Sequence, residues 1–426
     1  MKTQQEKKKK LNRVCILNPH GYVAYPPNLG KTDTGGQTLY ELELAKALGK
    51  RNIKVDIVTR LFDDFAQEEE IFENVKIIRI PCGPKGFVQK EKMYEIIPEF
   101  VQNFMHYLEK ARKEYSIIHS HYWDAGLAGV HLAKLLDIPH VFTPHSLGKL
   151  KKLELQEQIE TIPTQKLKPI FRFHVRIATE QQIMSKADAV VVICETSRIQ
   201  ILQHYLVDYE RIHVIYPGVD NNLFKPTKNG IDKKLEIKPN AVLTVSRMVP
   251  AKGLDRVIDA LAIIKNNVDF HFYMGGGNTD EQSSQEERDA EKQIRGLVKK
   301  YKMEERITFL GQIPHDLLPA YYRAAEVFVL AGRYEPFGMT TLEAMACGTV
   351  PIVSHIAGSR EVIVDGLNGF IVDTHDRKAL AGTIEKLLSD KKLNKKVAEN
   401  AAFTIQEHYS WDKIVENFIT LYTDLI

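Results

Sequence analysis

Short apolar runs alternate along the chain with amphipathic stretches. In the first half the short runs are almost continuously apolar, as expected for strands buried on both faces of a parallel sheet. The stretches between them repeat apolar residues at i, i+3 and i+4, which is typical of helices. The predicted strands are RVCILNP, KVDIVTR, VKIIRIP, SIIHS, HVFTPH, AVVVICE and IHVIYPG. This alternation predicts a parallel sheet with helices on both faces.

The pattern breaks at residues 217–234, where PGVDNNLFKPTKNGIDKK is polar and rich in turn residues, as in a linker. A second series of predicted strands follows at AVLTVSR, DFHFYMGGG, ITFLG, EVFVLAG, TVPIVS and GFIVD. The final HYSWDKIVENFITLYTDLI is amphipathic and predicts a helix. We therefore predict two doubly wound α/β domains, with ligands beyond the carboxyl ends of their strands.

The composition is that of an ordinary globular protein, with 44% hydrophobic residues, 27% charged residues and a net charge of +3. No stretch approaches the roughly 18 apolar residues of a membrane helix, and no secretory signal is visible. The four cysteines lack the spacing of a zinc site or a disulfide framework. We expect a cytoplasmic protein with no membrane or nucleic-acid partner, in which KKKK at 7–10 is a solvated tail.

A first motif, GRYEPFGMTTLEAMACG, follows the predicted strand EVFVLAG and carries Glu335 and Glu343 eight positions apart. Gly338 permits a turn that other residues resist, and Thr340 or Thr341 is expected to cap the helix that begins there. The N–H groups at a helix start form an anion site that suits a diphosphate. A helix with an acidic first turn and no ligand is the alternative for this motif alone.

A second motif, VSRMVPAKGLDR, places Arg247 directly after a strand and Lys252 at the opening of a helix. Two cations at that position suit a diphosphate leaving group, which gains charge as it departs. Two surface cations without a ligand are the alternative for this motif alone.

Together the two motifs resemble the donor-binding domain of the retaining GT-B glycosyltransferases, in the family that includes sucrose-phosphate synthase. The resemblance extends over nearly the whole chain, including PGVDNNLF and YSWDKI. It implies two Rossmann-like domains facing a cleft: 1–220 binds the acceptor and 221–408 the nucleotide sugar, with the helix of 409–426 packing back on the first domain. It implies no metal and no cofactor, only a nucleotide-sugar donor, UDP-glucose or GDP-mannose.

The resemblance also implies roles for residues of the donor site. Glu335 contacts the donor hexose and Glu343 the ribose, while Arg247 and Lys252 stabilise the leaving diphosphate. His145, which follows the strand HVFTPH, lies against the donor sugar. The catalytic set is therefore His145, Glu335, Arg247 and Lys252. Further donor contacts are expected from Gly35, Gly36, Gly338, Met339, Thr340, Thr341 and Leu342.

Cations gather after His145, at Lys149, Lys151 and Lys152, and again at Arg172 and Arg176. Because Arg and Lys bind phosphate, the cluster suggests a phosphorylated acceptor; a solvated basic helix face is the alternative. In these details the chain resembles most the sucrose-phosphate and mannosylfructose-phosphate synthase branch, which transfers a hexose to fructose 6-phosphate. The acceptor ligands that this implies are Gln37, Lys90, Tyr122, Asp124, Ser146, Lys151 and Arg176.

The expected function is therefore retaining transfer of a hexose to fructose 6-phosphate, giving sucrose 6-phosphate or mannosylfructose phosphate. The main alternative is a sucrose synthase-like enzyme, or another retaining GT-B glycosyltransferase with an acceptor such as inositol phosphate. A nucleotide-sugar epimerase of this fold and a non-catalytic sugar-binding protein are more distant alternatives. The expected partners are sugars and sugar phosphates; the sequence specifies neither the donor nucleotide nor the oligomeric state.

Overall fold

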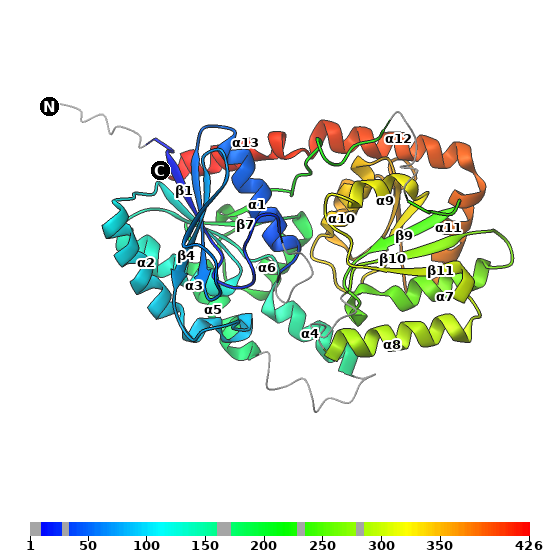
Figure 1. The fold of residues 1–426 in the computed structure, drawn as a ribbon, viewed down its shortest axis with the longest axis horizontal. Helices are drawn as coiled ribbons and strands as arrows, with labels where there is room; N and C mark the ends of the chain where they lie inside the picture. The colour runs from blue at the N-terminus through cyan, green and yellow to red at the C-terminus, as the bar shows by residue number, and fades with distance from the viewer. Residues whose placement is uncertain (1–9, 28–33, 160–171, 228–234, 278–284) are drawn as a thin grey trace. The chain divides into compact units, whose positions relative to one another are not determined.

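The computed structural model describes residues 10–27, 34–159, 172–227, 235–277 and 285–426. The chain divides into two compact units: unit 1 comprises Met1–Tyr216 and Ile414–Ile426, and unit 2 comprises Pro217–Lys413 (Figure 1). Most of the predicted basic tail and residues 228–234 of the predicted linker lie outside the described residues. The division of substrates between 1–220 and 221–408 stays a prediction.

Unit 1 is built on an eight-stranded sheet with the order β3-β4-β2-β1-β5-β6-β7-β8. The seven predicted strands are β1 Arg13–Leu17, β2 Lys54–Leu61, β4 Val75–Pro81, β5 Ile117–His121, β6 His140–Thr143, β7 Ala189–Val192 and β8 Ile212–Val214. Sequence reasoning missed β3, Glu68–Phe72, which pairs antiparallel with β4 at the sheet edge. Its sequence EEEIF is largely polar because an edge strand is only partly buried.

The helices of unit 1 connect these strands. They are α1 Gly36–Gly49, α2 Ile97–Ala111, α3 Trp123–Leu136, α4 Gly148–Ile159, α5 Phe173–Lys186 and α6 Glu195–His204, with short 3-10 turns at Lys90–Glu95 and Tyr209–Arg211. The last helix, α13, covers Trp411–Leu425, and its residues from Ile414 onward belong to unit 1. A buried hydrogen bond of 2.6 Å joins the hydroxyl of Tyr422 in α13 to Nδ1 of His119 in β5.

Unit 2 is built on a six-stranded sheet with the order β11-β10-β9-β12-β13-β14, and its described strand pairs are all parallel. The strands, all predicted, are β9 Ala241–Val245, β10 His271–Gly275, β11 Ile307–Gly311, β12 Val327–Leu330, β13 Val350–Ser354 and β14 Phe370–Val372. The helices are α7 Leu254–Ile264, α8 Gln285–Lys300, α9 Leu318–Ala324, α10 Met339–Ala346, α11 Arg377–Ser389 and α12 Lys391–His408. Short 3-10 turns cover Pro250–Lys252, Glu304–Arg306 and Gly358–Val362.

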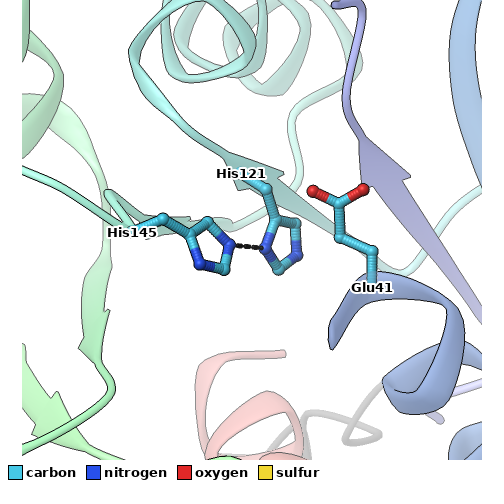
Figure 2. Close-up of side chains that lie close together, drawn as sticks. All are labelled: Glu41, His121 and His145. Atoms are coloured by element: carbon cyan, nitrogen blue, oxygen red, sulfur yellow. Dashed lines mark hydrogen bonds between the residues drawn. The ribbon is translucent and has the colours of Figure 1, made fainter. Parts of the chain in front are cut away.

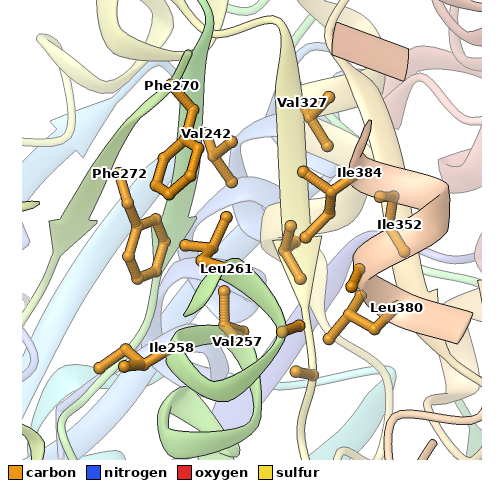
Figure 3. Packing of buried hydrophobic residues seen from close by; sticks show 14 of the residues in the cluster. Val242, Val257, Ile258, Leu261, Phe270, Phe272, Val327, Ile352, Leu380 and Ile384 are labelled. Atoms are coloured by element: carbon orange, nitrogen blue, oxygen red, sulfur yellow. The ribbon is translucent and has the colours of Figure 1, made fainter. Parts of the chain in front are cut away.

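Both faces of the unit 2 sheet are buried, which explains why its strands are continuously apolar. On one face, side chains such as Phe272 and Ile352 pack against α7 and α11, where Leu261 and Ile384 lie (Figure 3). Neighbouring strand residues point to opposite faces. Phe328, which follows Val327 of this cluster, therefore meets the ring of Tyr322 in α9, at a centroid distance of 5.7 Å.

The entry to α7 requires a glycine. Gly253 has a φ of +66°, a left-handed conformation that L side chains rarely adopt. A Cβ atom at this position would lie 2.1 Å from the carbonyl oxygen of Ala331, just after β12. The missing side chain therefore lets the loop after β9 approach the loop after β12 closely.

We expect Gly253→Ala to lower the free energy of unfolding by roughly 2 kcal/mol or more, because strained backbone and an atomic clash add. Chemical denaturation at equilibrium measures the change. The matched control is Gly382→Ala in α11, where the new methyl group meets no atom within 4 Å and should stabilise the helix by up to about 1 kcal/mol. Equal effects of the two substitutions would contradict the requirement at Gly253.

Candidate active site

The candidate site residues lie where the strand order of each sheet reverses. In unit 1 the reversal falls at β1 and β5, and in unit 2 it falls at β9 and β12. At such a point neighbouring loops run in opposite directions and leave a crevice at the carboxyl ends of the strands, where ligands bind. The segments after β1, β5 and β6 carry most of the unit 1 candidates, while Lys90 follows β4 and Arg176 lies in α5; the segments after β9 and β12 carry those of unit 2.

His145 lies two residues beyond β6, with its backbone in the left-handed region at a φ of +54°. Its Nε2 atom lies 2.8 Å from Nδ1 of His121, the last residue of β5. The ring of Tyr40 meets the His145 ring edge-on at 5.2 Å. Burial lowers the pKa of His145 to about 3, so the imidazole is neutral at pH 7. Within the described part of the chain, Nδ1 of His145 has no hydrogen-bond partner.

Glu41, in α1, is fully buried beside this pair. The side-chain amides of Gln37 and Asn18 donate to its two carboxyl oxygens at 2.9 and 2.7 Å. Burial raises the pKa of Glu41 to about 8, although the two amide donors act in the opposite direction. Figure 2 shows the ring of His121 between His145 and the carboxyl group of Glu41.

These three side chains are also a possible metal-ligand set, since one ligand atom from each of Glu41, His121 and His145 lies within 4.8 Å of the others. Two nitrogen ligands at about 2.0–2.1 Å from a tetrahedral ion lie roughly 3.3 Å apart. The two histidine nitrogens at 2.8 Å instead have hydrogen-bond spacing. The present arrangement is therefore a hydrogen-bonded cluster, and an ion would have to separate the two rings.

Four predicted acceptor ligands gather near the start of α3. The guanidinium of Arg176 donates to the hydroxyl of Tyr122 at 2.9 Å and to the carbonyl and hydroxyl oxygens of Ser146 at 2.8 and 3.1 Å. It also pairs with Glu180 at 2.6 Å, and both charged groups are buried. Lys90 reaches the same place, with Nζ 6.0 Å from the centroid of the Tyr122 ring.

This geometry favours supporting roles for two of the predicted acceptor ligands. Arg176 is only 4% exposed, and its guanidinium donates hydrogen bonds to Glu180, Tyr122 and Ser146. The carboxylate of Asp124 is fully buried and pairs with Nδ1 of His20 at 3.0 Å. Direct contact of either residue with an acceptor stays a prediction.

The remaining unit 1 candidates lie at the starts of α1 and α4. Gly35 is the N-cap of α1, and no side chain forms a capping hydrogen bond there. The first turn also contains no acidic residue, so this helix terminus suits an anion. Gln37 lies one residue beyond Gly36 and is held by Glu41. Lys151 lies in the first turn of α4 and is partly buried.

In unit 2, α10 begins at Met339 with Gly338 as its N-cap, at a φ of +95°. The prediction of a threonine cap is therefore wrong: Thr340 and Thr341 lie inside the first turn, and no side chain caps the helix. The side chains of Thr341 and Leu342 are buried, and the Thr341 amide donates to the carbonyl of Gly338 at 3.0 Å. The first N–H groups of a helix lack partners within it and suit an anion.

Glu335 and Lys252 meet beside this helix start. Nζ of Lys252, in the short turn before α7, lies 2.6 Å from Oε2 of Glu335, in the loop after β12. The same loop is fixed by Arg333, whose guanidinium donates to both carboxylate oxygens of Asp255 at 2.8 and 2.5 Å. Gly253, described above, permits this close approach of the two loops. Two separate sequence motifs thus form one site with a carboxylate and an ammonium group in contact.

Arg247 and Glu343 complete the unit 2 candidates. Arg247 is exposed, and its guanidinium forms no ion pair with any residue that the structure describes. Glu343 is 5% exposed in α10, and the hydroxyl of Tyr322 donates to its Oε2 atom at 2.9 Å. His315 lies 4.0 Å from the other oxygen, Oε1. The protein itself thus holds one carboxylate oxygen of Glu343 by a hydrogen bond.

Sequence reasoning missed several residues of this constellation, among them Glu41, His121 and Tyr322. A signal for His121 was present: in HSHYWD the two histidines are two positions apart in a strand and so share one face. In the structure the ring centroids of His119 and His121 lie 4.1 Å apart, with the ring planes tilted by 37°. Glu41 and Tyr322 occupy helical core positions, and nothing in their spacing indicates a polar contact.

The two Rossmann-like sheets, each with polar residues at its switch point, match the fold of the GT-B glycosyltransferases. Residues 34–223 match Glycosyltransferase Family 4, and residues 227–403 match Glycosyl transferases group 1. The chain therefore belongs to the glycosyltransferase family that includes the sucrose-phosphate and mannosylfructose-phosphate synthases, and it is an enzyme of the glycosyltransferase type.

Individual relatives are similar over almost their whole length. Mannosylfructose-phosphate synthase of Agrobacterium fabrum is 36% identical, covering 96% of this chain and 90% of the relative. D-inositol 3-phosphate glycosyltransferase of Corynebacterium glutamicum is 28% identical, covering 97% of each. The solved sucrose-phosphate synthase of Thermosynechococcus elongatus has a TM-score of 0.84 at 29% identity, covering 97% of this chain and 99% of that chain. These likenesses confirm the expected fold and family.

The raised pKa of Glu41 predicts a pH-dependent loss of stability. The unfolded chain releases this proton near pH 4.5, but the folded chain keeps it until about pH 8. Stability due to Glu41 therefore falls as pH rises between these values. We expect Glu41→Gln to gain stability relative to the parent protein from pH 5 to 8. Denaturant titrations at these pH values measure the free energy of unfolding of both proteins.

The control Glu114→Gln, at an exposed position, should show no such pH-dependent gain. If the free energies of unfolding of Glu41→Gln and the parent protein changed in parallel with pH, the prediction would be contradicted.

Proposed function

We propose that this enzyme transfers a hexose from UDP-glucose or GDP-mannose to fructose 6-phosphate, with retention of configuration at the sugar. Unit 2 binds the donor and unit 1 the acceptor. The observation that carries the proposal is the contact of 2.6 Å between Lys252 and Glu335 beside the uncapped start of α10. A nucleotide sugar joins polar hydroxyls directly to a diphosphate, so it needs a carboxylate and a cation side by side.

In the proposed reaction, Glu335 accepts hydrogen bonds from hexose hydroxyls and Glu343 from the ribose. Lys252, Arg247 and the α10 terminus stabilise the diphosphate as its bond to the sugar carbon breaks. The acceptor hydroxyl attacks the same face of the sugar, and its proton passes to the departing phosphate oxygen. His145 hydrogen-bonds to the donor sugar.

The acceptor side of the proposal rests on the cations near Tyr122. Lys90 lies against the Tyr122 ring, and Lys151 lies in the first turn of α4. Arg176 positions Tyr122 and Ser146, so these two neighbours are the groups that it presents to a ligand. A sugar phosphate offers both the anion and the hydroxyls that such a set recognises. The higher identity to mannosylfructose-phosphate synthase than to the inositol 3-phosphate enzyme favours fructose 6-phosphate.

The relationship to D-inositol 3-phosphate glycosyltransferases gives a second candidate acceptor, inositol phosphate. Inositol phosphate is also a phosphorylated polyol, so its phosphate group would be bound by the same cations.

The cytoplasm is the proposed compartment, supported by four buried cysteines that are all free thiols. In the described segments, no helix combines the length and the apolar character needed to cross a bilayer.

A panel of substrates tests the function. Enzyme is incubated with UDP-glucose, GDP-mannose or ADP-glucose, together with fructose 6-phosphate, fructose or inositol phosphate, and nucleotide release and product mass are followed. We expect release with one nucleotide sugar that depends on fructose 6-phosphate. Nucleotide release that depends on inositol phosphate would show that inositol phosphate is the acceptor in place of fructose 6-phosphate. Equal nucleotide release with fructose and with fructose 6-phosphate would contradict the proposal that the acceptor must be phosphorylated.

Arg247 tests the role of the cations at the donor. Because its exposed guanidinium has no ion pair with a described residue, Arg247→Ala should remove charge stabilisation of the leaving group and little else. We expect kcat to fall on the order of 10²–10³-fold with an unchanged melting temperature. The control Arg295→Ala, in α8 of the same unit, should retain parental turnover. Near-normal turnover of the Arg247 variant would remove that residue from the mechanism.

A further inference from the structure

The start of α4 is closed by two buried side chains that come from other helices. The first two N–H groups of this helix belong to Gly148 and Lys149. Gly148 donates to the two carboxylate oxygens of Glu180, in α5, at 3.1 and 3.0 Å. Lys149 donates to the hydroxyl of Tyr205, the C-cap of α6, at 3.3 Å. The start of α4 therefore differs from those of α1 and α10, where no side chain forms a capping hydrogen bond.

Glu180 joins this helix start to Arg176. Its carboxylate also accepts hydrogen bonds from Nε of Arg176, at 2.6 Å, and from the hydroxyl of Tyr205. Glu180 is fully buried, and Arg176 and Tyr205 are each 4% exposed. A buried ion pair held in this way is costly to break, because removing one partner leaves an uncompensated charge. The charge of Glu180 also occupies the position that an anionic ligand would take at a helix start.

Gly148 lets the side chain of Arg176 pass close to α4. A Cβ atom at this position would lie 3.0 Å from both Cδ and Nε of Arg176. That distance is shorter than the optimal separation of non-bonded heavy atoms, about 3.5–4.0 Å. A side chain at position 148 would therefore push Arg176 away from Ser146, whose carbonyl and hydroxyl oxygens it now contacts.

Arg176 also restricts the direction in which two hydroxyl groups can donate. Its guanidinium donates to the hydroxyl oxygen of Tyr122 at 2.9 Å and to that of Ser146 at 3.1 Å. A guanidinium has donors and no acceptor, so neither hydroxyl can direct its own proton at Arg176. Each hydroxyl is left to donate to another group. Because phosphate oxygens are strong hydrogen-bond acceptors, two such donors side by side suit a phosphate.

Lysines supply the net positive charge at this place. The charge of Arg176 is balanced by Glu180 within the same buried pair. Nζ of Lys90 lies 6.0 Å from the centroid of the Tyr122 ring, and Lys151 lies in the first turn of α4. The buried pair therefore contributes geometry, and the two lysines contribute attraction for an anion.

We propose that Glu180 and Tyr205 are positioning residues of the acceptor site. They fix Arg176 and the start of α4, and so hold the hydroxyls of Tyr122 and Ser146 as donors to an anionic group of the acceptor. Glu180 and Tyr205 themselves do not touch the ligand. That the anionic group is the phosphate of fructose 6-phosphate rests on the proposed function.

Equilibrium binding tests the proposal without requiring turnover. The Kd values of fructose 6-phosphate and of fructose are measured by calorimetry in the presence of UDP or GDP. Tyr205→Phe removes one hydroxyl and keeps the ring. We expect its Kd for fructose 6-phosphate to rise about fivefold, the effect of one lost hydrogen bond, with a much smaller change for fructose. An unchanged Kd for fructose 6-phosphate, or equal losses for the two sugars, would overturn the proposal.

A matched control and a second substitution accompany this variant. Tyr107→Phe, in α2, also removes a hydroxyl that donates to a carboxylate, that of Glu68 at 2.7 Å, and should keep the parental Kd. Gly148→Ala should displace Arg176 and weaken fructose 6-phosphate binding in the same way as Tyr205→Phe. Parental binding by Gly148→Ala, or a loss in Tyr107→Phe as large as that in Tyr205→Phe, would overturn the proposal.

NMR of the arginine side chains reports the network directly. The Nε–H group of Arg176 is assigned by its loss in Arg176→Lys. Because this group is buried and bonded to Glu180, we expect slow exchange of its proton with water in the parent protein. Exchange should be faster in Glu180→Gln, where the acceptor has lost its charge. Rapid exchange in the parent protein would overturn the fixed position of Arg176, whatever the enzyme transfers.

Kinetics separates positioning from a general structural effect. We expect Tyr205→Phe to raise the KM for fructose 6-phosphate and to leave the KM for the nucleotide sugar at its parental value; equal increases in both would overturn the positioning role. Weakened fructose 6-phosphate binding in Tyr205→Phe without hexose transfer in the substrate panel would support this proposal and remove the proposed function. Transfer to fructose 6-phosphate with an unchanged Kd in Tyr205→Phe would do the reverse.

Discussion

Parallel strand pairing around a central reversal is the constraint on which the rest of the structure depends. Because all strands of a parallel sheet end at the same edge, the loops after β5 and β6 are neighbours, and so are those after β9 and β12. The helices that follow begin at this edge and direct their positive ends there. Each unit therefore concentrates cations, helix termini and polar side chains at one place, and positive φ angles at residues such as His145 and Gly338 turn the chain there.

The two units differ in how deeply they bury the ion pairs at this edge. In unit 1, Arg176 and Glu180 neutralise each other away from solvent, and the pair supports Tyr122 and Ser146. In unit 2, Lys252 and Glu335 are in contact but only partly buried, so a ligand can exchange for part of that contact. A buried pair is costly to break, whereas a partly solvated pair is worth little by itself. The first arrangement suits a support and the second suits a binding site.

The hydrophobic pattern predicted most elements of the fold, because a strand buried on two faces must be continuously apolar. It failed for β3, where one edge strand is partly solvated and reads EEEIF. It also failed at α10, because the left-handed Gly338 takes the N-cap position and leaves Thr340 and Thr341 inside the helix. The candidate residues that follow strands could be named from sequence, since their place is fixed by chain order. Their partners could not be named, because Arg176 and Tyr122 are 54 positions apart.

By itself the sequence determined the order of strands and helices, the family, and the residues that reach the carboxyl edge of each sheet, since these depend on local pattern and chain order. Only the tertiary structure decided which polar groups are exposed and which are paired. It buried Asp124 with His20, and it placed Glu41 beside two histidines from different strand ends. The physical reason is that hydrogen bonding and burial depend on distances across the sheet, and strands far apart in the chain become neighbours there through crossover connections.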